Sequence, residues 1–124
     1  MARWWRDLPG SQFAYSHISQ QFAALNAPIL PKSQYDAFYG TDLEHRLHES
    51  GTQQVVIGGV MTHLCCECTA RSAFVRGFEV YFVVDATATY NEELHRASLL
   101  TLSHGFVLPV LVEDLVSEIN NNVL

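Results

Sequence analysis

Short apolar runs alternate along the chain with stretches in which apolar residues recur every three or four positions. The runs are typical of buried strands, and the recurring spacing is typical of helices that bury one face. Strands are predicted at Gln54–Ile57, Glu79–Val84 and Phe106–Val110, with a short extended piece at Pro28–Leu30. Helices are predicted at Ile18–Leu25, Thr41–Glu49, Cys65–Arg76, Asn91–His104 and Leu111–Ile119.

Polar and glycine residues mark the ends of several predicted helices. Thr41 and Asn91 are suited to be N-caps, and Gly77 and Gly105 follow the last turns of their helices. Because strands alternate with helices, we expect right-handed βαβ crossovers and a mostly parallel sheet. The pattern therefore predicts an α/β fold, with its chemistry at the carboxyl ends of the strands.

Composition favours one globular domain that spans residues 1–124. Hydrophobic residues make up 48% of the 124 residues and charged residues 16%, so the chain can build a core. The net charge is −6 with 7 lysines and arginines, and no basic stripe is present. This excludes nucleic acid and acidic lipid as expected partners. No apolar stretch approaches the ~20 residues of a membrane span, so no membrane partner is expected.

Cysteine usage and the first residues bear on the compartment. All 3 cysteines fall within Cys65–Cys68, which is not a disulfide framework. The first residues lack the apolar core of a secretory signal. We therefore expect a cytoplasmic protein. Trp4 and Trp5 are either an exposed patch or a contact with a partner.

The stretch Gly58–Ala70 carries the candidate chemistry. It follows the apolar run Val55–Ile57, so a buried strand, a glycine turn and then Cys65 succeed one another at the predicted start of a helix. Free N–H groups and the helix dipole at such a start favour a thiolate. The same N–H groups can hold a developing oxyanion. The stretch therefore indicates a nucleophile site.

Three segments together resemble the isochorismatase-like cysteine hydrolases, which include nicotinamidases, N-carbamoylsarcosine amidases and isochorismatases. They are Gly59-Val60-Met61-Thr62-His63-Leu64-Cys65 with Thr69-Ala70, the lysine segment Pro31–Leu43, and Gly77-Phe78 with Val83-Val84-Asp85-Ala86. The resemblance covers roughly Leu8 to Leu115. It implies a Rossmann-like, three-layer α/β/α fold and a catalytic triad of cysteine, lysine and aspartate.

Carried over residue by residue, the resemblance makes Cys65 the nucleophile and Lys32 the triad lysine. It also implies a cis peptide bond between Val60 and Met61, which would turn the Met61 N–H toward an oxyanion beside the Cys65 N–H. The expected substrate-binding residues are Phe38, Thr62 and His63. The implied substrate is a small molecule with an amide or related C–N bond, or a vinyl ether, and no cofactor or metal site is carried over.

The triad aspartate has no match in this sequence. In the family it ends the first strand, upstream of the lysine, whereas Asp7 is the only acidic residue before Lys32 and follows no apolar run. We therefore expect the chain to correspond to the later portion of the family fold, N-terminally truncated. Gln54–Ile57 would then be an exposed apolar edge, a template for pairing with another chain, so we expect a homo-oligomer.

Other interpretations stay open at this point. Cys65 could be a small buried hydrophobic residue, as Cys66 and Cys68 are expected to be. A second candidate function is that of a catalytically inactive remnant that acts through oligomerisation or ligand binding. Cys65 and Cys68 also form a Cys-x-x-Cys spacing, so a thiol redox protein is a third candidate function.

Three further polar residues receive structural interpretations. Asp85 is expected to cap the turn after its strand. His95 and His104 are expected to be ordinary helix residues. A zinc site at His63 and the cysteines is disfavoured, because the spacing supplies no second pair of ligands.

Overall fold

In the computed structural model of the chain, residue 18 and residues 20–122 are described. Trp4, Trp5 and Asp7 lie outside these residues. The chain divides into two compact units, Met1–Pro31 and Lys32–Leu124. The single domain expected over residues 1–124 stays a prediction.

The described part of the first unit holds one short helix. This is α1 (Gln20–Ala23), which is shorter than the helix predicted at Ile18–Leu25. The prediction of an extended piece at Pro28–Leu30 is not matched by a strand, and most of the described residues here are exposed.

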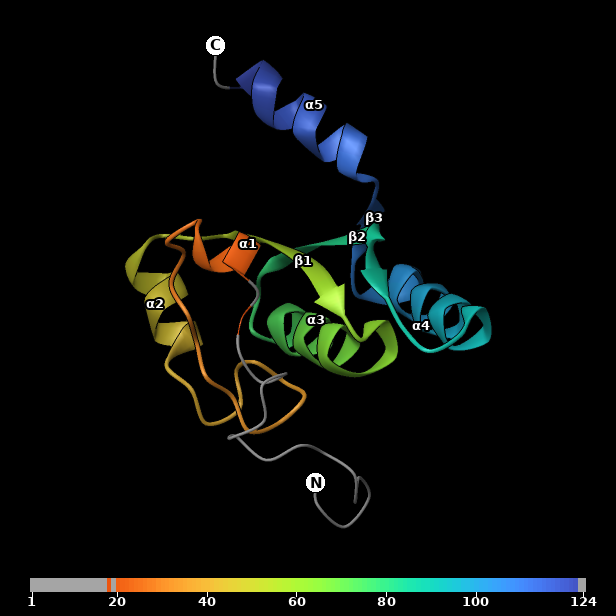
Figure 1. Ribbon diagram of the computed structural model, residues 1–124, viewed down its shortest axis with the longest axis horizontal. Helices are drawn as coiled ribbons and strands as arrows, with labels where there is room; N and C mark the ends of the chain where they lie inside the picture. The colour runs from red at the N-terminus through yellow and green to blue at the C-terminus, as the bar shows by residue number, and fades with distance from the viewer. Residues whose placement is uncertain (1–17, 19, 123–124) are drawn as a thin grey trace. The chain divides into compact units, whose positions relative to one another are not determined.

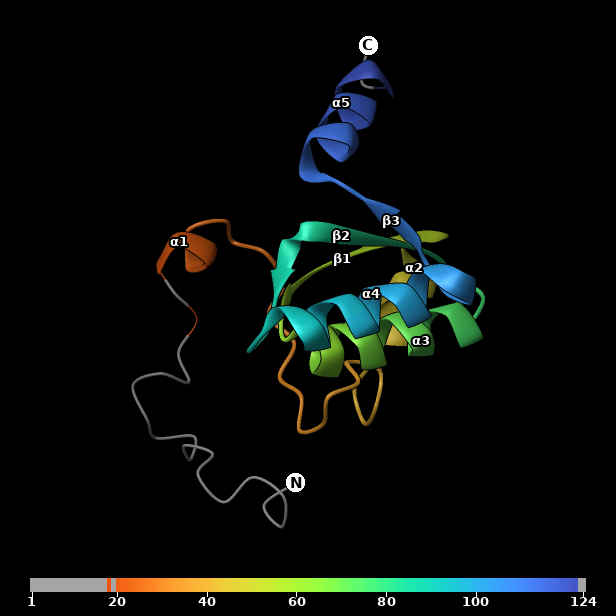
Figure 2. The same cartoon turned by 90° about the vertical axis from the view of Figure 1, so that its right-hand side faces the viewer.

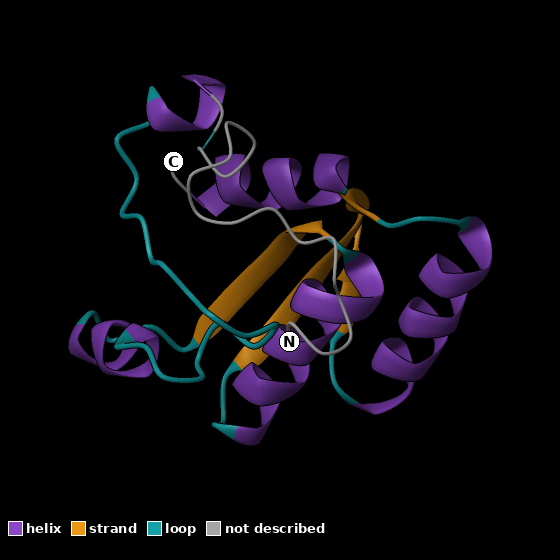
Figure 3. Cartoon of the chain, turned by 60° about the horizontal axis from the view of Figure 1, so that its bottom comes forward, coloured by secondary structure: helices purple, strands orange, loops and turns teal. Residues whose placement is uncertain are grey.

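The second unit is an α/β fold around a three-stranded sheet (Figure 1). Its elements are α2 (Leu43–Glu49), β1 (Gln54–Val60), a π-helical turn (Thr62–Cys66), α3 (Glu67–Val75), β2 (Glu79–Ala88), α4 (Glu92–Gly105), β3 (Leu108–Val110) and α5 (Val112–Asn122). The strand order is β1-β2-β3, and both neighbouring pairs are parallel. Figure 3 shows the strands of this sheet in orange with helices around them. The predicted parallel sheet is confirmed, as are the three predicted strands apart from their ends.

Helices α3 and α4 lie side by side on one face of this sheet (Figure 2). The core forms between them and the strands, where Ala70, Ala73, Phe82 and Leu102 have no exposed surface. Small residues on α3 let the helix approach the strands closely, and Phe82 of β2 fills the space between. The apolar face predicted for each helix therefore packs against the sheet.

Capping side chains fix where two of the helices begin. The Asn91 side chain accepts a hydrogen bond from the Leu94 N–H (2.9 Å), so Asn91 is the predicted N-cap of α4. Asp85 was expected to cap the turn after β2. Instead its Oδ1 accepts from the Val112 N–H (3.0 Å), so it caps α5, 27 residues away. The parallel register of β2 and β3 brings the two positions together.

The helix predicted at Cys65–Arg76 begins earlier than expected. The chain enters a π-helical turn at Thr62 and becomes α-helical at Glu67. The start predicted at Cys65 is therefore wrong by three residues, and Cys65 lies within the first turn. The predicted end holds, because Gly77 has a φ of +88° and the Phe78 N–H bonds to the Ala73 carbonyl (3.1 Å).

Within the described residues, β1 is an edge strand whose other side has no strand partner. Two of its valines are exposed, Val56 at 52% and Val60 at 68%. The same described part of the chain contains no helix long and apolar enough to cross a membrane.

Candidate active site

The end of β1 is shaped for close approach to β2. A Cβ on Gly58 would lie 3.3 Å from the Ala86 carbonyl oxygen, so a side chain there would crowd the neighbouring strand. Gly59 has a φ of +119°, which residues with a side chain rarely adopt. The Val60–Met61 peptide bond that follows is cis, at the bond that the family resemblance implies.

The π-helical turn places Cys65 directly after this strand end. The Met61 carbonyl accepts hydrogen bonds from the N–H groups of Leu64 (3.1 Å) and Cys66 (3.2 Å). Cys65 lies between these two residues, and its side chain is partly exposed, whereas Cys66 is buried. The turn thus presents one of two adjacent thiols to solvent.

Lys32 meets the exposed thiol. Its ammonium group donates to the Cys65 sulfur at 3.5 Å and to the Gln34 carbonyl at 2.7 Å. The two candidate catalytic residues predicted from the sequence are therefore in contact. An ammonium group beside a sulfur stabilises the thiolate, which is the nucleophilic form of cysteine.

Thr69 of α3 holds the lysine segment from one side. Its hydroxyl accepts a hydrogen bond from the Ala37 N–H (3.0 Å) and donates to the Tyr35 carbonyl (3.4 Å). Thr69 lies one helical turn after Cys65. The helix that begins with the nucleophile turn therefore also holds the segment that carries Lys32.

Asp36 and Ser72 make the second attachment. The Asp36 carboxylate accepts from the Ser72 hydroxyl (2.7 Å) and from the Phe38 N–H (2.8 Å). Arg76 donates to the Ser72 hydroxyl, and its guanidinium carbon lies 4.8 Å from the centre of the Phe38 ring. Thr69 and Ser72 of α3 and Arg76 at its C-cap recur every three or four residues, so one face of this helix contacts the segment from Tyr35 to Phe38.

Helix α4 holds the other side of the nucleophile turn. The Thr62 hydroxyl forms a hydrogen bond with His95 Nδ1 (3.0 Å), and the Ser98 hydroxyl donates to the Thr62 carbonyl (3.4 Å). His63 Nδ1 is bound to the Thr89 hydroxyl (2.6 Å) at the end of β2. The interpretation of His95 as an ordinary helix residue is therefore wrong.

The other two cysteines have less nucleophilic character. Burial, followed by the neighbouring Cys65, raises the pKa of the Cys66 thiol to about 11. Burial and then the Glu67 carboxylate also raise the pKa of Cys68. Both groups are therefore uncharged thiols near neutral pH, which disfavours a redox role for Cys68. No group of three or more histidine, cysteine or acidic side chains in the described chain is arranged to hold a metal ion.

The three expected substrate-binding residues lie in different surroundings. Phe38 is 6% exposed and stacks near Phe78 in the core. Thr62 has no exposed surface, and its hydroxyl is bound to His95, so the structure gives it a supporting position and not one open to substrate. His63 is partly exposed, two residues before Cys65, and can still meet a bound molecule.

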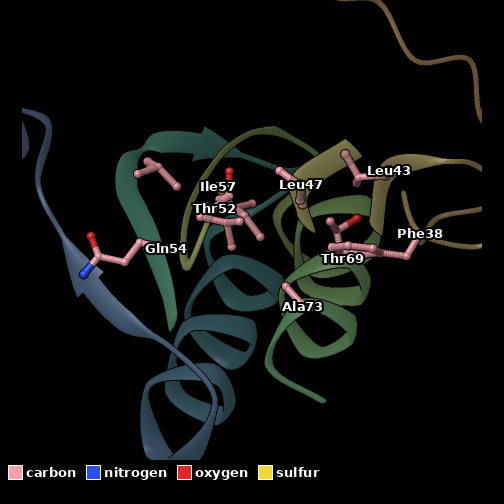
Figure 4. Close-up of a pocket in the computed structure, with 10 residues that line it drawn as sticks. Phe38, Leu43, Leu47, Thr52, Gln54, Ile57, Thr69 and Ala73 are labelled. Atoms are coloured by element: carbon pink, nitrogen blue, oxygen red, sulfur yellow. The ribbon is translucent and has the colours of Figure 1, made fainter. Parts of the chain in front are cut away.

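An apolar cavity of about 350 Å³ lies between α2, α3 and β1 (Figure 4). Phe38 forms part of its wall, with Leu43 and Leu47 from α2 and Ala73 from α3. Neither Cys65 nor Lys32 is among its lining residues. Phe38 therefore belongs to a cavity that the thiol does not line.

Asp36 and Asp85, two described aspartates of the matched segments, have other partners. Asp36 binds Ser72 and the Phe38 N–H, and Asp85 caps α5. The hydrogen bond to the Cys65 sulfur in the described part of the chain comes from Lys32. The structure therefore assigns neither Asp36 nor Asp85 to the position of the triad aspartate.

His95 and Ser98 were missed although the sequence carries a signal for them. Together with the fully buried Leu102 they occupy positions three and four residues apart, on the face of α4 that packs inward. Polar side chains on such a face need buried partners. Their spacing could have indicated a contact with the nucleophile turn.

Comparison with known proteins shows a consistent pattern. The model of the isochorismatase domain family matches residues 3–114. Nicotinamidase 3 from Arabidopsis thaliana is 53% identical over 78 residues, which are 63% of this chain and 39% of the relative. Enterobactin synthase component B from Escherichia coli K12 is 36% identical over 88 residues, 71% of this chain and 31% of the relative. The chain therefore spans less than half the length of these curated relatives.

Solved structures show the same likeness. An isochorismatase-like hydrolase from Alkaliphilus metalliredigens superposes with a TM-score of 0.68 at 33% identity, over 70% of this chain and 47% of the other. A nicotinamidase from Bacillus subtilis gives a TM-score of 0.62 at 31% identity, over 64% of this chain and 44% of the other. The likeness extends to the fold as well as to the sequence.

Proposed function

Because the chain belongs to the isochorismatase family, we propose that it is a cysteine-dependent hydrolase in which Cys65 is the nucleophile. Its relatives include proteins named as a nicotinamidase and as isochorismatase-like hydrolases. The proposed substrate is a small molecule with an amide or related C–N bond, or with a vinyl ether. The contact between Lys32 and Cys65 carries the proposal.

The proposed reaction on an amide has two stages. The Cys65 thiolate attacks the carbonyl carbon, and the negative charge moves to the oxygen, where the N–H groups of Met61 and Cys65 are proposed to bind it. The C–N bond then breaks, and the amine leaves with the proton that a base received from the Cys65 thiol. Water hydrolyses the resulting thioester, which releases the carboxylic acid and restores the thiol.

Lys32 has the role of holding negative charge on the sulfur. Its ammonium group is bound on one side by the Gln34 carbonyl, and its hydrogen bonds to the described residues go to that carbonyl and to the Cys65 sulfur. A protonated ammonium group cannot accept a further proton. The reaction therefore needs a separate base to receive the thiol proton.

The engagement of Asp36 and Asp85 favours a second candidate function. Without a base, the Cys65–Lys32 pair would bind a small carbonyl compound and not turn it over. Both candidates use the same residues, so one experiment separates them from each other.

The test measures the turnover of simple amides, beginning with nicotinamide, and the formation of a covalent adduct on the protein. Ammonia release that is lost in Cys65→Ala and kept in Cys68→Ala supports hydrolysis and contradicts a redox function. Intact mass spectrometry would then detect a thioester on Cys65 under rapid acid quenching. Saturable binding of the amide without ammonia release would reject hydrolysis in favour of the second candidate.

A further inference from the structure

Thr62 is a buried polar residue with a specific partner. It has no exposed surface, and its hydroxyl lies 3.0 Å from His95 Nδ1. A buried hydroxyl that loses its partner is costly, so this hydrogen bond constrains both residues. The hydroxyl can donate to the ring nitrogen or accept from it, so the contact forms with either neutral tautomer of His95.

Helix α4 also holds the main chain of Thr62. The Ser98 hydroxyl donates to the Thr62 carbonyl (3.4 Å), and Ser98 lies three residues after His95 on the same face of α4. The Glu67 N–H bonds to the same carbonyl. Thr62 is therefore fixed at its side chain and at its main chain by one neighbouring helix.

The position of Thr62 affects the sulfur of Cys65. Thr62 is the first residue of the π-helical turn, and Cys65 is the fourth. The lysine segment is held separately, by Thr69 and Ser72 of α3. The 3.5 Å contact between Lys32 and Cys65 therefore joins the lysine segment, which α3 holds, to the nucleophile turn, which α4 holds.

From this geometry we infer that His95 is a positioning residue for the Cys65 thiol and acts through Thr62. Among the described residues the Cys65 sulfur is bound by Lys32, whereas His95 is bound to Thr62, so the effect of His95 is on where the turn begins. As a contribution to turnover, this inference rests on the proposed hydrolase function. As a contribution to thiol reactivity, it can be tested without any substrate.

The test measures how fast iodoacetamide alkylates Cys65 in the native full chain, with peptides quantified by mass spectrometry. We expect His95→Phe and Thr62→Val each to slow the reaction by about fivefold, the effect of one lost hydrogen bond. His95→Asn places an amide oxygen near the position of Nδ1, so it should restore most of the rate. The double variant should be no slower than Thr62→Val, because both changes remove one contact.

Two controls separate positioning from general loosening of the fold. His104→Phe makes the same replacement at an exposed position in the last turn of the same helix and should not change the rate. Cys66 is 5% exposed and adjacent to Cys65, so its alkylation reports opening of the turn. A positioning role changes the Cys65 rate while Cys66 stays unreactive.

The outcomes are distinct. The inference is supported if Cys65 alkylation slows in His95→Phe, recovers in His95→Asn, and leaves Cys66 unmodified. It stands even if the wild-type protein hydrolyses no amide, because that result would reject only the proposed function. An unchanged Cys65 rate in folded His95→Phe, additive losses in the double variant, or faster Cys66 alkylation would overturn it. If His95→Phe does not fold, His95→Gln compared with His95→Asn makes the same test, because the longer amide does not place its oxygen at Nδ1.

Discussion

The Lys32 ammonium lies 3.5 Å from the Cys65 sulfur, although 33 residues separate the two along the chain. Helix α3 accounts for this contact, because its first turn follows Cys65 and its Thr69 and Ser72 hold the lysine segment. The contact therefore depends on α3, which holds the lysine segment, and on α4, which holds the start of the nucleophile turn.

Replacing Lys32 by methionine should slow alkylation of Cys65 near neutral pH by roughly threefold to tenfold, because a nearby cation favours the thiolate and solvent weakens its effect at an exposed site. Lys32→Arg keeps the positive charge and is the matched control. The measurement is the pH dependence of the alkylation rate. Equal rates in the methionine and arginine variants would show that the charge of Lys32 does not activate the thiol.

The raised pKa values of Cys66 and Cys68 should delay the modification of both thiols as pH rises. The pKa of Cys66 is raised to about 11 and that of Cys68 is also raised, so both remain protonated near neutral pH. Raising a thiol pKa reduces the thiolate at any pH below it, so modification of Cys66 should appear only as the pH approaches 11. Peptide mapping after brief alkylation checks this delay. Early labelling of Cys66 or Cys68 would contradict it.

Thr69→Val should lower the free energy of unfolding by about 1–3 kcal/mol, because it leaves the Ala37 N–H and the Tyr35 carbonyl without their shared partner. Valine has nearly the shape of threonine, so the change tests the hydroxyl. Thr69→Ser keeps the hydroxyl and serves as the control in urea unfolding. The same Thr69→Val variant should slow Cys65 alkylation, since the segment that carries Lys32 is released. A stability loss without that slowing would show that the segment stays in place by other contacts.

The β1 edge should promote self-association. Within the described residues one side of β1 has no strand partner, and its sequence from Gln54 to Val60 contains no lysine or proline, which are common protections of edge strands. Light scattering after size exclusion should detect species larger than one chain, increasing with protein concentration. Val56→Lys should reduce them. A monomer at all concentrations would contradict the expectation of a homo-oligomer.

The order and type of the elements followed from local pattern. Apolar runs predicted the three strands, and Asn91 and Gly77 marked helix ends correctly, because capping depends on a few neighbouring residues. The start of the nucleophile helix was placed at Cys65 and lies at Thr62, because a π-helical turn carries no local sequence signal of the kind that capping gives. Asp85 was assigned to its own strand end, since its true partner at Val112 depends on tertiary structure.

Only part of the candidate site could be predicted from the sequence. Lys32 and Cys65 were paired by resemblance, and the structure places them in contact. Phe38 and Thr62 remain predicted substrate-binding residues; the sequence did not indicate that both would be buried, because burial depends on how the segments pack. His95 was overlooked because a single histidine on a helix usually needs no explanation. Its partner lies 33 residues earlier, on another element.

The contact between Thr62 and His95 also sets an order of assembly. A ribosome releases the chain from its N-terminus, so Lys32 and Cys65 leave it before His95 does. Until α4 has been synthesised, the nascent chain carries the cysteine without the hydrogen bond that fixes its turn. The turn that carries Cys65 is therefore expected to reach its final geometry late in synthesis, when most of the fold around it is already available.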